Sequence, residues 1–268
     1  MKARDRAVVD VDVVRSAETG PVRDQVAVEA PMEVRLNGTP FSVIMRTPGE
    51  DRHLTLGFLF GEGLLGSRAE VDRVDVPDDA DIVNVVFVRA RGDAIAAAIA
   101  ERRQVTMNSS CGMCGRRSLE SLPMSAARPA IDWTVSGDVV QQLPGRLRDA
   151  QSAFARTGGL HAAALFDLQG RLDASAEDVG RHNAVDKLIG RALDEGRLPL
   201  RASLLCVSGR TSFEIVQKAW RAGIALIAAV SAPSSLAIDL AAEANITLLG
   251  FVRDGRFNIY THPARIDC

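Results

Sequence analysis

Leu204-Leu205-Cys206-Val207-Ser208-Gly209-Arg210-Thr211-Ser212 is the stretch that decides the fold. Its first four residues are apolar without alternation, which is typical of a short strand covered on both faces of a sheet. The small and polar residues that follow form a turn, and they lead into segment 213–222, which we expect to be a helix. The stretch therefore predicts one strand–turn–helix unit of an α/β protein.

Similar units lie on both sides of this stretch. Downstream, we expect strands at 224–230, 246–250 and 256–260, and a helix at 236–244. Upstream, we expect strands at 162–166 and 171–176, and helices from residue 138 to about 155 and over 178–193. Strands that alternate with helices of this length predict right-handed crossovers and a largely parallel sheet.

The N-terminal portion has a different pattern. Three β-type runs lie at 25–30, 33–36 and 41–46, and Asn37-Gly38 between the last two is the strongest short hairpin signal. A helix at 51–65, strands at 71–76 and 82–89, and an alanine-rich helix at 93–103 follow. Residues 1–20 are polar, and we expect the first few to be loose. We predict a smaller α+β domain over 1–104 and an α/β domain over 105–268.

The composition excludes several classes of protein. The chain has 268 residues, of which 47% are hydrophobic and 25% charged, and its net charge of −2 argues against a nucleic-acid or anionic-membrane partner. The first ten residues carry no apolar signal core, and the longest apolar run, 222–232, is too short to span a bilayer. Four cysteines in a chain this long do not form a secreted disulfide framework. We expect a cytoplasmic protein.

Two of the cysteines point to covalent chemistry. Cys111-Gly112-Met113-Cys114 places two thiols three residues apart among glycines, and Arg116 and Arg117 follow. A thiol is a good nucleophile only as a thiolate, which neighbouring guanidinium groups stabilise. Disulfide exchange, zinc binding and sulfur carriage all remain open at this point.

The residues around the pair weaken the first two alternatives. Structural zinc needs four ligands, but there is no second Cys pair, and His161, His182 and His262 stand apart in the sequence. We therefore expect no structural metal. A thioredoxin-like pair lies where a strand meets a helix of a βαβ unit, whereas this pair precedes the α/β portion. Its glycine-rich setting favours a mobile thiolate.

The turns after the central strands predict an anion site. Arg210 and Ser212 follow one strand, and Ser231 and Ser234 follow the next. Turns of this kind gather at one edge of an open sheet, where helix N-termini favour phosphate. Plain N-capping by serine is the competing interpretation, and both stay open.

The charged segment 177–187 has a structural and a functional interpretation. We expect Asp178 to cap the helix and Asp186 to pair with His182 one turn before it. His182 is a general-base candidate, but the segment contains no nucleophile. We therefore favour a structural or ligand-positioning role.

Taken together, these segments resemble the FdhD family, the formate dehydrogenase accessory sulfurtransferases. The resemblance covers the chain from about residue 25. The motifs that carry it are Ser110-Cys111-Gly112-Met113-Cys114-Gly115, Thr157-Gly158-Gly159-Leu160-His161, Glu177-Asp178-Val179-Gly180-Arg181-His182-Asn183-Ala184-Val185-Asp186-Lys187, Ser208-Gly209-Arg210 and Gly250-Phe251.

The resemblance implies a function that composition does not show. Proteins of this family take sulfur from a cysteine desulfurase as a persulfide, here on Cys111 with Cys114 assisting, and pass it to the bis(molybdopterin guanine dinucleotide) molybdenum cofactor used by formate dehydrogenase. The family's cofactor-contacting segment matches Phe251, Val252, Arg253, Asp254, Gly255 and Arg256. The C-terminal domain is expected to be a three-layer, cytidine-deaminase-like fold without the zinc site. We also expect a homodimer, because a paired dinucleotide offers two equivalent halves.

Two alternatives to sulfur transfer remain. The first is an insertion chaperone that binds the molybdenum cofactor without transferring sulfur. The second is a redox protein that depends on zinc or on a disulfide.

Overall fold

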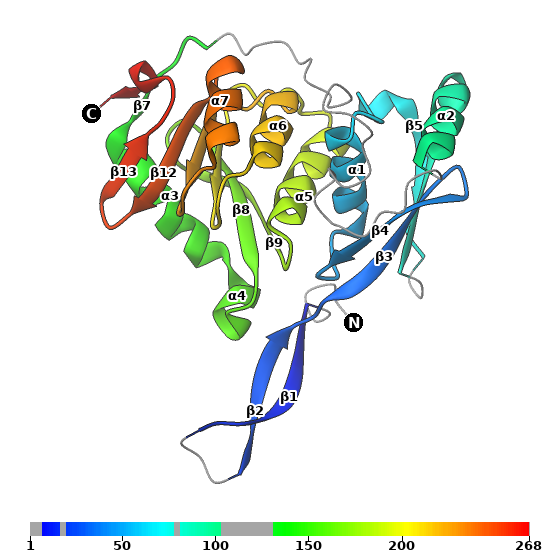
Figure 1. Cartoon of the computed structure of the whole chain (residues 1–268), viewed down its shortest axis with the longest axis horizontal. Coiled ribbons are helices and arrows are strands. Elements are labelled where there is room, and N and C mark those ends of the chain that lie inside the picture. The colour runs from blue at the N-terminus through cyan, green and yellow to red at the C-terminus, as the bar shows by residue number, and fades with distance from the viewer. Residues whose placement is uncertain (1–6, 17–19, 78–80, 103–130, 268) are drawn as a thin grey trace.

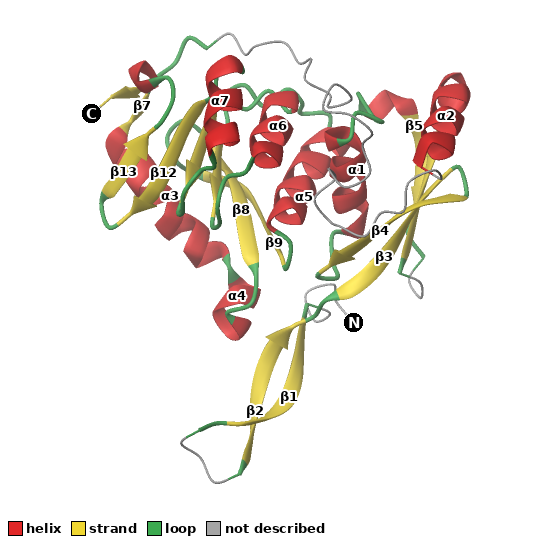
Figure 2. Cartoon of the chain, in the orientation of Figure 1, coloured by secondary structure: helices red, strands yellow, loops and turns green. Residues whose placement is uncertain are grey.

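The computed structural model describes residues 7–16, 20–77, 81–102 and 131–267, and it has a mixed α/β fold (Figures 1 and 2). Its largest sheet has the strand order β13-β12-β11-β10-β8-β9. The strands are β8 (His161–Phe166), β9 (Leu172–Asp178), β10 (Leu204–Val207), β11 (Leu226–Ala229), β12 (Thr247–Arg253) and β13 (Arg256–Ile259). The helices of this portion are α3 (Gly137–Ala150), α4 (Ser152–Thr157), α5 (Arg181–Asp194), α6 (Phe213–Arg221) and α7 (Ser235–Glu243).

The central strands are parallel, as predicted, but the sheet as a whole is mixed. β10 pairs in parallel with β11, and β11 with β12. β8 runs antiparallel to both β9 and β10, and β13 runs antiparallel to β12. The prediction of a largely parallel sheet was wrong because β8–β9 and β12–β13 are hairpins, whose short turns permit only antiparallel pairing.

Helices cover both faces of this sheet. Along β10, Leu204 and Cys206 pack with α3 on one face, whereas Leu205 and Val207 belong to the core on the α5–α7 face. Both faces are therefore buried, which explains the unbroken apolar run that decides the fold. A further strand pair, β7 (Val135–Ser136) with β14 (Ile266–Asp267), lies before α3 and brings the two ends of this portion together.

The N-terminal portion contains a four-stranded sheet in the order β4-β3-β6-β5. Its elements are β3 (Ala30–Leu36), β4 (Thr39–Arg46), α1 (Asp51–Gly61), β5 (Val71–Asp75), β6 (Ile82–Phe87) and α2 (Gly92–Arg102). The predicted hairpin is confirmed, because Asn37 and Gly38 both have positive φ angles, 51° and 82°, at the turn between β3 and β4. α1 ends four residues earlier than predicted, where Gly63 adopts a positive φ angle.

α1 and α5 pack against each other and join the two portions (Figure 1). A Cβ atom on Gly57 would lie 1.9 Å from the carbonyl oxygen of Asp186, and one on Gly190 would lie 1.8 Å from that of His53. The glycines are therefore required for the close approach of the two backbones. One hydrophobic cluster runs through both portions. The predicted boundary at residue 104 lies outside the described residues.

A two-stranded arm projects from the body of the molecule (Figure 1). β1 (Val8–Val14) pairs antiparallel with β2 (Pro21–Ala27) over the full length of both strands. The sequence prediction missed β1, although Val-Asp alternation in 8–14 is a strand pattern. Near its base, Arg156 of α4 donates to Gln25 of the arm. None of the described helices is long and apolar enough to cross a membrane.

Candidate functional site

Three turns meet at the carboxyl edge of the central strands, as the sequence predicted. Thr211, after β10, donates its N–H to the carbonyl of Ala232, after β11, at 3.2 Å, and accepts from the N–H of Ser234 at 3.0 Å. The N–H of Phe251, in β12, donates to the carbonyl of Ser231 at 3.2 Å. Hydrogen bonds thus join the turns after β10 and β11 to the end of β12 in one continuous surface, which we call the edge surface (residues 208–212, 231–235 and 250–256).

The serines predicted for ligand binding have different partners. Ser234 is the N-cap of α7, and its Oγ accepts from the N–H of Ala237, so the capping interpretation accounts for this hydroxyl. Ser212 begins α6 without a side-chain capping bond, and its Oγ lies 3.1 Å from Nε2 of His182 instead. Ser231 contributes its carbonyl to the bond with Phe251. Arg210 is exposed on the same surface.

The segment from Phe251 to Arg256 ends β12 and begins β13. Gly250 is required there, because a Cβ atom would lie 2.9 Å from both Pro233 and Tyr260. The Arg253 guanidinium lies over the Phe251 ring, 5.5 Å from its centroid. Asp254 and Gly255 form the turn with positive φ angles of 53° and 69°, and Arg253 faces Arg256 across the hairpin. Both arginines are exposed, whereas Val252 is buried against the α3 layer.

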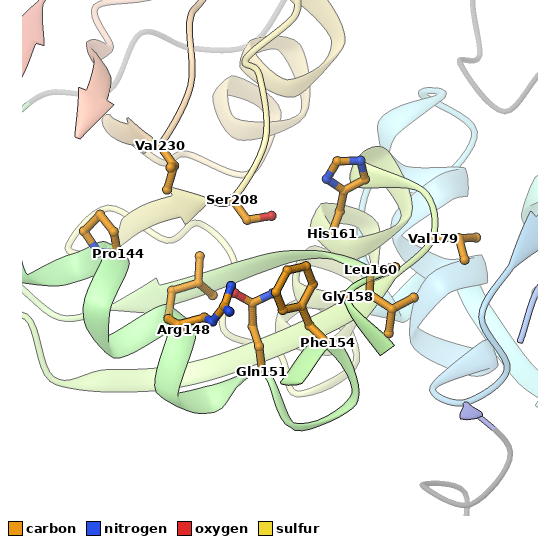
Figure 3. Close-up of a pocket in the computed structure, with 12 residues that line it drawn as sticks. Pro144, Arg148, Gln151, Phe154, Gly158, Leu160, His161, Val179, Ser208 and Val230 are labelled. Carbon is orange, nitrogen blue, oxygen red and sulfur yellow. The ribbon is translucent and has the colours of Figure 1, made fainter. Parts of the chain in front are cut away.

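A pocket of about 500 Å³ opens beside the edge surface, and its lining includes residues from the α3–α4 region, the start of β8 and the turn after β10 (Figure 3). Arg148 of α3, Gln151 between the two helices and Phe154 of α4 line the pocket. The Arg148 guanidinium lies 4.3 Å from the centroid of the Phe154 ring. Across the pocket, His161 begins β8 and Ser208 follows β10. The lining is therefore an apolar wall with a few polar groups, which is typical of a small-molecule site.

Positive groups surround His161. Its ring packs on Gly209, where a Cβ atom would lie 3.3 Å from the imidazole Nδ1. Burial lowers the pKa of His161 below its ordinary value, and the nearby charges of Arg181, His182 and Arg210 lower it further. The Nε of Arg181 is buried and makes no hydrogen bond within the described residues. Arg181 and Arg210 lie near His161 but are not among the described residues that line the pocket, of which the only arginine is Arg148.

The charged segment 177–187 fixes the two portions together. Asp178, fully buried, pairs with Lys187 at 2.8 Å and accepts from the N–H groups of Thr47 and Gly180. Lys187 also donates to the Thr47 carbonyl, and Asn183 donates to the Met45 carbonyl at the end of β4. The structural interpretation of this segment therefore accounts for most of its charges.

Two local predictions in this segment were wrong. Asp178 does not precede the helix directly but ends β9, and Gly180 is the N-cap of α5. Asp186 pairs with Lys218 of α6 at 2.6 Å rather than with His182. His182 instead faces α6, where it lies 3.7 Å from a carboxylate oxygen of Glu214. In each case we predicted an interaction within α5, whereas the structure has a hydrogen bond or ion pair between residues of different helices or strands.

Cys111 and Cys114 lie outside the described residues, so their role stays a prediction. Among the residues that the structure does describe, no three His, Cys, Asp or Glu side chains are grouped to hold a metal ion. Cys206 is fully buried in β10, and burial raises the pKa of its thiol to about 12. It is therefore unreactive, as its apolar strand indicates.

Sequence reasoning missed the pocket residues Arg148, Gln151 and Phe154. They come from the junction of α3 and α4, where we expected one continuous helix from residue 138 to about 155. The helix breaks at Gln151, whose backbone is not helical. The pattern Thr157-Gly158-Gly159-Leu160-His161 was the available signal, because paired glycines before a strand end a helix and place His161 at the sheet edge.

Comparison with known proteins agrees with this geometry. Residues 27–267 match the model of the FdhD/NarQ family. A sulfur carrier protein FdhD of Streptomyces avermitilis is 48% identical over 262 residues, covering 94% of this chain and 93% of that protein. The protein of the same name in Sulfolobus acidocaldarius is 44% identical over 259 residues, covering 97% and 98%.

A solved structure is similar over the same length. The crystal structure of a Desulfotalea psychrophila protein assigned as a formate dehydrogenase accessory protein matches with a TM-score of 0.74 and 25% sequence identity. The match covers 97% of this chain and 98% of that one. Since sequence and fold both match over nearly the whole chain, this protein belongs to the FdhD/NarQ family.

Proposed function

We propose that this protein is a sulfur carrier that takes persulfide sulfur from a cysteine desulfurase and delivers it to the bis(molybdopterin guanine dinucleotide) molybdenum cofactor for formate dehydrogenase. The observation that carries the proposal is near full-length similarity to relatives named sulfur carriers, together with the Cys111–Cys114 pair. The similar crystal structure of an accessory protein supports formate dehydrogenase as the final recipient.

The donor step is a thiol exchange on sulfur. The Cys111 thiolate attacks the outer sulfur of the desulfurase persulfide, the S–S bond of the donor breaks, and the donor cysteine leaves as a thiolate. Cys111 then carries the persulfide. Arg116 and Arg117 follow closely in sequence and favour the thiolate form that this attack needs.

Delivery requires two electrons, which the second thiol provides. The Cys114 thiolate attacks the inner sulfur on Cys111, and the outer sulfur leaves with the bonding electron pair as hydrosulfide, which the acceptor takes up. A Cys111–Cys114 disulfide remains, and a cellular dithiol reduces it before the next cycle. In this proposal Cys114 is the resolving thiol.

The acceptor is a multiply anionic dinucleotide, and the edge surface suits such a substrate. Arg210, Arg253 and Arg256 lie exposed there, and Ser212 and Ser234 are the N-cap residues of α6 and α7. Guanidinium groups and helix N-termini both favour phosphate. A paired dinucleotide also has two equivalent halves, which supports a homodimer. Helices on both faces of the sheet are compatible with the proposed cytidine-deaminase-like layering.

Intact mass spectrometry tests the donor half. After incubation with a cysteine desulfurase and cysteine, we expect the wild-type chain to gain one sulfur atom and Cys111→Ala to gain none. Cys114→Ala should still gain it but fail to release sulfide. Cofactor binding without any sulfur adduct would favour the insertion chaperone, and zinc retained after purification would favour the redox protein.

Nucleotide binding tests the acceptor half. We expect the double variant Arg210→Ala plus Ser234→Ala to bind GDP more weakly than the wild type, because it loses a guanidinium and a helix cap at the edge surface. Ser136→Ala is the matched control, since Ser136 is the N-cap residue of α3 and its Oγ accepts a hydrogen bond from the backbone N–H of Asp138. The substitution therefore removes a similar cap away from the edge surface. Equal GDP affinity in the wild type and the double variant would contradict the assignment.

A further inference from the structure

The pocket beside the edge surface contains a buried amide without a partner. Gln151 lies between α3 and α4 and is only 5% exposed. Its backbone N–H donates to the Arg148 carbonyl, and its own carbonyl accepts from Ala155, but its side-chain amide makes no hydrogen bond to another described residue. The side chain lines the pocket, where Figure 3 shows it among the other lining residues. Both the donor and the acceptor of this amide are therefore available to a ligand.

The rest of the described lining is close to neutral. Arg148 is the only arginine among these residues, and none of them is an aspartate or a glutamate. Burial lowers the pKa of His161 and nearby cations lower it further, so this imidazole is neutral at neutral pH. The Ser208 Oγ accepts from the Ala162 N–H at 2.9 Å and keeps its own proton to donate. Such a lining suits an uncharged ligand, unlike the arginines of the edge surface.

A flat surface lies in the same pocket as the amide. Phe154 of α4 is half-buried in the lining, and the Arg148 guanidinium lies 4.3 Å from the centroid of its ring. Planar heterocycles stack on aromatic rings and on guanidinium groups alike. Leu147 and Leu160 add apolar walls, and the volume of about 500 Å³ is in the range of small-molecule sites. The pocket therefore suits a flat ring that has hydrogen-bonding groups on one edge.

We propose that this pocket binds a pterin ring, with the Gln151 amide bonded to the pyrimidinone edge of the ring and Phe154 stacked on its face. That edge has an N–H donor next to a carbonyl acceptor, which the oxygen and nitrogen of one carboxamide match. The ligand class rests on the proposed function, because the sulfur acceptor contains pterin rings. Guanine has a similar edge, but a guanine nucleoside also brings a ribose, and the described lining has no carboxylate to bind ribose hydroxyls.

Fluorescence titration of the full chain with 6-hydroxymethylpterin tests the site, because pterins fluoresce and this probe has neither phosphate nor sugar. We expect Gln151→Met to bind the probe about ten-fold more weakly, since methionine has a similar volume but no amide. Phe154→Leu should weaken binding about five-fold, because the stacked ring is lost. Gln142→Met in α3 is the matched control and should bind as the wild type, since the Gln142 side chain bonds to Arg146 and does not line the pocket.

A second ligand makes the test independent of whether the variants fold. 1,3-Dimethyllumazine has the same fused ring system, but methyl groups block the N–H donor on its edge. The wild type should bind it at least about ten-fold more weakly than 6-hydroxymethylpterin. In the wild type, the side-chain amide resonances of Gln151 should also shift when 6-hydroxymethylpterin is added.

Three results would overturn the inference: no binding of 6-hydroxymethylpterin, equal affinity for 1,3-dimethyllumazine, or tight binding of guanosine that Gln151→Met weakens to the same extent. The last result would assign the pocket to guanine. Sulfur loading of Cys111, measured in parallel in the wild type, keeps the two proposals separate. Loading without pterin binding overturns only the assignment of the pocket, and pterin binding without loading overturns only the carrier.

Discussion

At the scale of single residues, Glu214 shows how the edge surface is fixed. The neighbouring His182 lowers the pKa of Glu214 to about 2, against the opposite effect of burial, and the Ser212 hydroxyl and the Glu214 N–H add to the lowering. The Ser212 Oγ in turn lies 3.1 Å from His182 Nε2. The three side chains therefore hold the start of α6 against the start of α5, where Arg181 lies.

This cluster predicts an acid-sensitive contribution to stability. In the unfolded chain Glu214 has its ordinary pKa of 4.5, so the stabilisation is complete above that pH and is lost as pH falls from 4.5 toward about 2. We expect Glu214→Gln to unfold at lower urea than the wild type at neutral pH, and this difference to shrink below pH 4.5.

Urea unfolding at several pH values measures the effect, with Glu195→Gln as the control. Glu195 also has a lowered pKa, from Arg191 and Arg197, but it is exposed and its substitution should change stability little. A Glu214→Gln difference that stays constant well below pH 4.5 would contradict the assignment.

For single residues, the sequence predicted where a side chain lies in the fold better than which hydrogen-bond or ion-pair partner it contacts. The edge turns carry Arg210, Ser212 and Ser234 where expected, because the carboxyl ends of neighbouring parallel strands meet by geometry. Which group each side chain contacts depends on the packing of α5 against α6, and a pattern within one helix does not contain that information. Asp186 shows this, since it pairs with Lys218 across two helices.

At the scale of elements, the contact between α1 and α5 decides how the two portions meet. Gly57 and Gly190 let the two backbones approach to a distance that no side chain permits. Both glycines lie inside predicted helices, 51–65 and 178–193, where local propensity alone says only that glycine disfavours a helix. Their real role depends on the neighbouring helix, and local propensity does not reveal it.

We expect Gly190→Ala to destabilise the protein by about 1–3 kcal/mol or more, because the added methyl group forces the helices apart. The control is Gly145→Ala in α3, where no heavy atom lies within 4 Å of the added Cβ. That change should be neutral or stabilising by up to about 1 kcal/mol, since alanine favours a helix. Thermal unfolding of the two variants measures the difference. Equal melting temperatures would contradict the prediction, because they would mean that α1 and α5 move apart to accommodate the methyl group without loss of stability.

At the scale of the whole molecule, the two predicted domains share one hydrophobic core. The same buried cluster contains Leu36 of β3, Leu56 of α1 and Leu205 of β10. Polar contacts reinforce the junction, because Asp194 of α5 bonds to Arg52 of α1 and to Arg68. The sequence predicted a change of pattern near residue 104, and that change does not require separate cores.

A shared core predicts a single cooperative unfolding transition. Both tryptophans, Trp133 and Trp220, belong to the C-terminal portion, so their fluorescence reports on that part alone. Leu36→Ala removes a fully buried side chain from the N-terminal sheet and should cost about 2–5 kcal/mol. In a cooperative molecule the tryptophan transition and the far-UV circular dichroism transition shift together to lower urea.

Val43→Ala in β4 is the matched control, because Val43 is 62% exposed in the same sheet and its loss should shift neither transition. If Leu36→Ala shifts only the circular dichroism signal, the N-terminal sheet unfolds independently. The contacts between α1 and α5 then form a separable interface rather than a common core. Coincident shifts would instead mean that the two portions unfold as one unit, held together by the packing of α1 against α5.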